Sequence, residues 1–308
     1  CSSIFRWLAA FHGPEQEELR RKLAERAAAD PTQPKAFIPA PDEHLRGLVQ
    51  VVAAVVAFLQ HHAPVAVATL DMDATLVPTT KGSALFCYEH YRAYQPLTTF
   101  WFEQGLIVHS EFRDGNVPAG FQQLRVFKEG LALLPPGVEK VRLRSDTAGY
   151  QHDLLRYCAS GHNERFGVIE FSVCCDVTLE FKKAVAQVHE GDWEDEWRQE
   201  KGGRVKTGRQ FAEVNFVPDA IAFSKKDPEY RYIAIREPVA QPALPGMAAQ
   251  QSFPFPTTEA NAQTYKLHGI VTNMEGDLQT RVRWNYERCG KSEEMHAVVK
   301  VDCAGGTC

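Results

Sequence analysis

The sequence predicts an α/β fold in which a mixed β-sheet is flanked by helices. Apolar runs of strand length, such as residues 65–77 and 166–173, alternate with segments whose apolar residues recur three and four apart. The chain has 308 residues, of which 44% are hydrophobic and 24% charged, as in a globular protein with a sizeable core. Its formal net charge of −5 argues against uniform coating of nucleic acid and is compatible with a local basic groove.

The first 62 residues are expected to form a helical N-terminal segment. Residues 14–29 predict a charged helix whose apolar positions are too sparse for a core, so we expect it to be exposed to solvent. Residues 30–41 contain four prolines and indicate a linker. Residues 44–62 predict a second, largely buried helix. Its longest apolar run, 51–59, has nine residues, whereas a bilayer requires about 20, so we expect a core helix and no membrane partner.

Residues 63–173 are predicted to form the first part of a core domain. In chain order, the expected elements are strands at 65–77, 97–103 and 106–112, a helix at 119–134, a strand at 140–144, a helix at 150–159 and a strand at 166–173. The dipeptide Gln104-Gly105 indicates a hairpin between the second and third strands. This element order is that of a ribonuclease H-like sheet, in which carboxylates on the first and fourth strands meet at one sheet end.

The regular order of elements ends after residue 173. Residues 174–262 are predicted to form a β-rich insertion, and residues 263–308 to form the second part of the core domain. A final helix is expected to open at Ser292, a favourable N-cap residue. Because the chain begins with Cys1 and stops soon after this helix, we expect it to be truncated at both ends.

The cysteines indicate a reducing compartment. All eight are scattered along the chain without a Cys-x-x-Cys pair or a His grouping, so the sequence predicts no zinc site. No charged-then-apolar leader argues for secretion. We therefore expect a cytoplasmic protein.

Three carboxylates far apart in the sequence could share one site. Asp71 and Asp73 end the first strand and point to the same face, because side chains alternate along a strand. Burying a carboxylate without a partner costs several kcal/mol, so these acids need a cation, donors or water. Asp146 follows the fourth strand, and Glu293 lies in the first turn of the final helix. Together with Asp73 they could hold two Mg²⁺ or Mn²⁺ ions about 3.5 to 4 Å apart.

Each of these acids also has an ordinary explanation, and one pattern has a rival interpretation. Asp after a strand often caps a turn, and Glu in a first helical turn is favoured by the helix dipole. The pattern Asp-x-Asp-x-Thr-Leu also matches haloacid dehalogenase-type phosphatases, with Asp71 as nucleophile and Asp73 as general acid. That family needs a second strand ending in Gly-Asp-x-x-x-Asp or Asp-Asp, whereas residues 144–149 read RSDTAG and the next acid is Asp153. The predicted hairpin after the first strand also departs from that fold.

Five segments taken in order resemble the DDE transposases of bacterial insertion sequences. They are residues 70–77 (LDMDATLV), 94–97 (YQPL), 111–116 (EFRDGN), 144–149 (RSDTAG) and 288–294 (RCGKSEE), and the resemblance covers roughly residues 35–306. It implies a ribonuclease H-like catalytic domain, interrupted by the β-rich insertion, that cuts DNA at transposon ends and joins the 3′-hydroxyl to a target. The implied partners are the terminal inverted repeats, target DNA and a second copy in a synaptic complex on the nucleoid.

Carried over by position, the resemblance implies the catalytic, metal-binding triad Asp73, Asp146 and Glu293. Asp73 is preferred over Asp71 because it is followed by a small residue and then Thr, which leaves Asp71 to support the ligand. Further residues expected to support the site or contact DNA are Tyr286, Arg288, Lys300, Arg113 and Asn116. Tyr286 and Lys300 keep the family's offsets from the Glu, whereas Arg288 lies one position before the family's Arg. A third interpretation is an inactive relic that only binds DNA.

Overall fold

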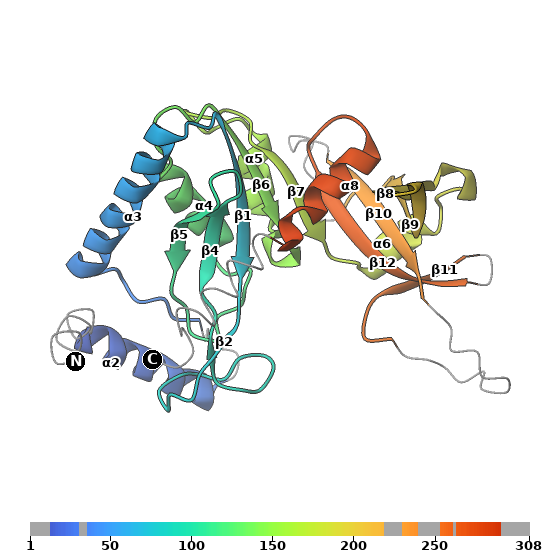
Figure 1. Cartoon of the computed structure of the whole chain (residues 1–308). Coiled ribbons are helices and arrows are strands. Elements are labelled where there is room, and N and C mark those ends of the chain that lie inside the picture. Colours follow the sequence, from blue (N-terminus) through green and yellow to red (C-terminus); the bar gives the residue numbers. More distant parts are fainter. Residues whose placement is uncertain (1–12, 31–35, 219–229, 240–252, 261–262, 291–308) are drawn as a thin grey trace. The chain divides into compact units, whose positions relative to one another are not determined.

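The computed structural model describes residues 13–30, 36–218, 230–239, 253–260 and 263–290 (Figure 1). The chain forms two compact units. Unit 1 covers Cys1–Arg142 and Arg288–Cys308, and unit 2 covers Leu143–Glu287. The division falls inside strand β6 (Lys140–Ser145).

Unit 1 is built on an antiparallel meander of three strands, β1 (Val67–Ala74), β4 (Leu97–Trp101) and β5 (Leu106–Glu111), in the order β5-β4-β1. The predicted hairpin between the second and third of these strands is confirmed. It turns at Gly105, whose φ of +67° suits glycine and whose N–H donates to the Trp101 carbonyl at 2.8 Å. Two short strands, β2 (Val77–Pro78) and β3 (Ala93–Tyr94), pair separately.

Three helices of unit 1 are described: α2 (Pro14–Ala29), α3 (Glu43–His62) and α4 (Gln123–Ala132). Helix α4 packs against β4 and β5 (Figure 1). At Gly130 a Cβ atom would lie 3.3 Å from the Thr99 side chain, so the helix and the sheet are in close contact there. The predicted helix at 119–134 begins only at Gln123, because Gln122 has a left-handed φ of 53°.

Unit 2 contains a second set of antiparallel strands in the order β7-β12-β10-β9-β8, with β11 paired to β12. A cluster of apolar side chains from β9, β10, β12 and α8 forms its core: Phe211, Ile233, Ile235, Ile270 and Val282. The strands are β7 (Glu170–Cys175), β8 (Glu194–Glu200), β9 (Gly203–Val214), β10 (Arg231–Pro238), β11 (Thr257–Ala260) and β12 (Gln263–Thr272). The helices are η1 (Thr147–Gly149), α5 (His152–Ala159), α6 (Leu179–Val185), η2 (Glu190–Asp192) and α8 (Leu278–Tyr286).

The fold class is as predicted: helices flank a mixed, mostly antiparallel sheet. Helices α6 and α8 were not expected from the sequence. Strand β12, where the core domain was expected to resume, pairs with β7 on one side and with β10 on the other. The four-part division at residues 62, 173 and 262 stays a prediction.

The prediction that residues 44–62 form a largely buried helix is wrong as regards burial. Helix α3 forms, but within it only Val56 and Gln60 are buried. Its residues 51–59 are apolar on every side, so the spacing of apolar residues could not indicate which face meets the sheet. Among the described helices, α3 is the one with the length and apolar composition of a membrane span, a test that core helices of soluble proteins also pass.

Candidate active site

The two acids of the first strand lie at the end of β1 and share one face of the meander. Asp71 pairs with Phe100 and Asp73 with Thr98, and directly opposite residues of an antiparallel pair lie on the same face. Asp71 is fully buried, whereas Asp73 is partly exposed. The Thr98 hydroxyl donates to the Asp73 backbone carbonyl at 3.2 Å, which fixes the strand where the acid projects.

The opposite face of the meander is covered by α4. Thr99 pairs with His109 across β4 and β5, and Leu97 pairs with Glu111. Because side chains alternate along β4, these residues point away from the face of Asp71 and Asp73. The acids therefore lie on the face of the sheet that α4 does not cover.

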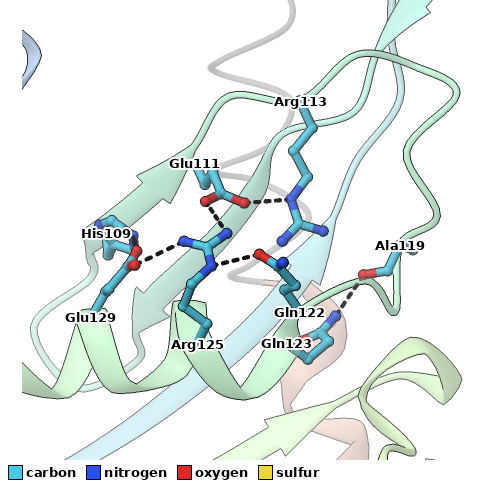
Figure 2. A network of polar contacts seen from close by, with 8 residues as sticks. All are labelled: His109, Glu111, Arg113, Ala119, Gln122, Gln123, Arg125 and Glu129. Carbon is cyan, nitrogen blue, oxygen red and sulfur yellow. Dashed lines mark hydrogen bonds and ion pairs between the residues drawn. The ribbon is translucent and has the colours of Figure 1, made fainter. Parts of the chain in front are cut away.

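A network of charged side chains connects β5 to α4 on this covered face (Figure 2). The Glu111 carboxylate accepts hydrogen bonds from Arg113 Nε at 2.8 Å and from Arg125 Nη2. Arg125 Nη1 also donates to Glu129 at 2.8 Å. His109 Nε2 lies 3.0 Å from the other oxygen of Glu129. Glu111 thus joins two arginines from different elements.

Arg113 has the most enclosed guanidinium of this network. Its side chain is fully buried, and within the described part of the chain neither Nη1 nor Nη2 has a hydrogen-bond partner. Burial lowers the pKa of Arg113, and the negative charge of Glu111 opposes that shift. The Arg113 backbone carbonyl accepts from the Gln95 N–H at 2.8 Å. Arg113 therefore holds the end of β5 in place, and its expected DNA contact stays a prediction.

The next residues of the same motif form a tight junction with α2. Arg20 donates to both oxygens of the buried Asp114, at 2.6 and 2.9 Å, and to the Ser83 carbonyl at 2.6 Å. At Gly115 a Cβ atom would lie 2.5 Å from the Ala93 carbonyl oxygen, so only glycine fits. Asn116, which follows, is half-buried. Sequence reasoning missed Arg20 because its partner lies 94 residues further along the chain.

Asp146 lies in unit 2, directly after β6. Its Oδ1 accepts from the Ala148 N–H at 3.0 Å and caps the short helix η1, which is the ordinary role of Asp after a strand. At Gly149 a Cβ atom would lie 2.4 Å from the Ser145 side chain, so the turn is closely packed. Asp73 belongs to unit 1, so neither unit by itself contains both carboxylates.

The remaining predicted residues lie around the end of α8 or outside the described residues. Tyr286 is the last residue of α8, with the Arg209 guanidinium 4.8 Å from its ring centroid. Burial raises the pKa of Tyr286 to about 12. Arg288 is partly exposed and belongs to unit 1. Glu293 and Lys300 lie outside the described residues.

The donor chemistry of the predicted triad suits a hard cation, because carboxylate oxygens are the ligands that Mg²⁺ prefers. Within residues 13–290, gaps excepted, no three side chains of the His, Cys, Asp or Glu type are grouped closely enough to hold a metal ion. Glu293, the third expected ligand, lies outside this part of the chain. The two-ion site stays a prediction.

Comparisons with known proteins identify no family for the chain. No family model matches it, and no curated protein matches it. One of the solved structures that it resembles is the cryo-EM structure of a piggyBac transposase synaptic complex with hairpin DNA. The TM-score is 0.43 at 9% identity, over 92% of this chain and 48% of that one. The chain therefore spans about half the length of that protein, and so weak a likeness carries no functional argument.

Proposed function

We propose that the chain is a transposase of the DDE class that cleaves phosphodiester bonds at insertion-sequence ends and transfers the cut strand to target DNA. The proposal rests on the five ordered motifs, and the position of the first motif on the fold supports it. Asp73 lies near the end of β1, on the face that α4 leaves uncovered, and β1 pairs with the antiparallel β4–β5 hairpin. Its proposed place of action is the nucleoid, in the cytoplasm.

In this proposal Asp73, Asp146 and Glu293 are the ligands of two Mg²⁺ or Mn²⁺ ions. Such ions activate water or a 3′-hydroxyl and stabilise the leaving oxygen when they are bound. Asp73 is partly exposed, whereas Asp71 is buried, and in this proposal Asp71 supports the ligand Asp73. The proposed substrates are double-stranded terminal repeats and target DNA, held by two copies of the chain.

The triad is tested by replacing each acid with its amide. Asp73→Asn, Asp146→Asn and Glu293→Gln should each abolish metal-dependent cleavage of the element's ends, because each removes a charged ligand. DNA binding, measured by fluorescence anisotropy, should stay close to that of the unchanged chain. Asp153→Asn is the matched control: this exposed acid in α5 lies close after Asp146 in the sequence, and cleavage should persist. Normal nicking by any triad variant would remove that residue from the site.

The same variants separate the alternatives. A phosphatase of the haloacid dehalogenase type would need Asp71 to reach its substrate, yet Asp71 is fully buried and β1 pairs with the antiparallel β4–β5 hairpin. We expect no hydrolysis of p-nitrophenyl phosphate. Turnover that is lost in Asp71→Asn and kept in Glu293→Gln would favour the phosphatase. DNA binding without cleavage in the unchanged chain would indicate a relic.

A further inference from the structure

Helix α3 exposes a row of large apolar side chains that nothing in the proposed chemistry uses. Its members, called here the α3 stripe, are Leu48, Val51, Val55 and Phe58, with 41%, 58%, 52% and 61% of their surfaces exposed. The opposite side of the helix carries the buried Val56 and Gln60 and packs near β5. The stripe is thus a second apolar face on a helix that already buries one.

The spacing of the stripe is that of a seam between two helices. Its members follow one another at intervals of three, four and three residues, the alternation that keeps apolar side chains facing a partner helix. Lipid or a flat protein surface requires only an apolar face, without this alternation. The spacing therefore favours a helix as the occupant.

The stripe is also symmetric along the helix. Leu48 and Phe58 lie equally far from Ala53 on either side, and so do Val51 and Val55. A two-fold axis passing near Ala53 would bring Leu48 against Phe58 of a second copy, and Val51 against Val55. Interfaces with two-fold symmetry need such a self-complementary patch.

The acidic N-terminus of α3 favours the same antiparallel arrangement. Asp42 is the N-cap residue and Glu43 lies in the first turn. Antiparallel pairing keeps the two acidic ends apart and places the N-terminus of each helix dipole beside the C-terminus of the other. Parallel pairing would place the two acidic ends together.

We propose that α3 is a dimerisation helix, which pairs antiparallel with α3 of a second copy of this chain through the α3 stripe. The dimer forms without DNA and does not depend on the catalytic proposal. A test of the dimer can therefore fail while the triad stands, and the reverse also holds.

The first test is the mass of the chain in solution, measured by sedimentation velocity at micromolar concentration without DNA. The unchanged chain should be a dimer. Val51→Glu should weaken dimerisation by about 100-fold or more, because it places a carboxylate in the centre of an apolar interface. Leu19→Glu is the matched control: Leu19 is 52% exposed on α2, outside the stripe, and its variant should remain a dimer. Circular dichroism should show both variants folded, since both side chains are exposed.

The second test determines whether the two α3 helices of the dimer are antiparallel or parallel. In the antiparallel pair Val51 faces Val55, so mixing Val51→Glu with Val55→Lys should restore a heterodimer. Mixing Val51→Glu with Val51→Lys should not, because those positions face each other only in a parallel pair.

Three outcomes would overturn the proposal. They are a monomeric unchanged chain, a Val51→Glu variant that remains a dimer, and rescue by the Val51→Lys mixture alone. Co-sedimentation of a monomeric unchanged chain with anionic phospholipid vesicles, lost in Val51→Glu, would assign the stripe to a lipid surface instead.

Discussion

At the scale of single residues, one carboxylate binds both arginines on the face of the meander that α4 covers. Glu111 has a side chain that is 11% exposed, and it accepts hydrogen bonds from Arg113 and Arg125 (Figure 2). The Arg113 side chain is fully enclosed, and among the described residues Glu111 contributes more than Glu129 to balancing its positive charge. A buried charge that loses its partner destabilises the folded state strongly, whereas an exposed ion pair contributes little.

Two carboxylates that share Arg125 should therefore differ in their contribution to stability. Glu111→Gln should lower the free energy of unfolding by about 3 kcal/mol, because it leaves Arg113 buried without a counter-charge. Glu129→Gln, at a side chain that is 42% exposed, should cost less than about 1 kcal/mol. Urea unfolding followed by circular dichroism measures both. Equal decreases in the free energy of unfolding would show that Glu111 is not the main counter-charge of Arg113.

A second prediction concerns two tyrosines of unit 2. The hydroxyls of Tyr150 and Tyr232 lie 3.1 Å apart, and burial raises the pKa of Tyr150 to about 12 and that of Tyr232 further. An unfolded tyrosine titrates near pH 10. Since the folded state favours the neutral phenols, their stabilising contribution is complete below about pH 10 and declines as the pH rises toward 12.

This decline can be measured directly. The free energy of unfolding of the unchanged chain should fall between about pH 10 and 12, in step with the absorbance of tyrosinate. Tyr150→Phe should reduce the slope, because it removes one of the two coupled phenols. An unchanged slope in that variant would show that other groups control the alkaline transition.

At the scale of elements, α2 and α3 are both exposed helices, but the contacts that hold them differ. Helix α2 buries Ala27 alone among its residues and is attached to the rest of unit 1 through Arg20, which binds Asp114. The Asp114 side chain is 6% exposed, so this ion pair lies largely out of water. Helix α3 instead packs one apolar side near β5 and exposes the α3 stripe.

The attachment of α2 predicts a local effect of one substitution. Arg20→Ala should cost about 2 kcal/mol, because it leaves the buried Asp114 unpaired. It should also increase amide hydrogen exchange across residues 14–29. Arg21→Ala is the control, since Arg21 is exposed and its ion pairs within the described part of the chain are with Glu18 and Glu25 of the same helix. Unchanged exchange in the Arg20 variant would show that other contacts hold α2.

At the scale of the whole molecule, Asp73 lies in unit 1 and Asp146 in unit 2, and the arrangement of the predicted triad stays a prediction. The formal net charge is −5, so DNA binding would have to use locally basic surface rather than the overall charge of the chain. A dimer through α3 would double the number of such surfaces.

Local patterns predicted the elements that carry the candidate site. The apolar run before Asp71 predicted β1, and Gln104-Gly105 predicted the hairpin that follows it. Asp146 was expected either to cap a turn or to bind a metal, and the cap is observed. These predictions succeed because alternation, turn preference and capping act over a few neighbouring residues.

By itself, the sequence determined the type and order of the main elements and the position of Asp71 and Asp73 on one strand face. Only the tertiary structure decided which side of α3 is buried, that Arg20 attaches α2 to Asp114, and that Glu111 binds Arg113 at the end of β5. The physical reason is the distance along the chain over which each effect acts. The periodicity of strands and helices depends on residues close together in the sequence, whereas burial and the pairing of charges depend on side chains that the fold brings together from distant positions.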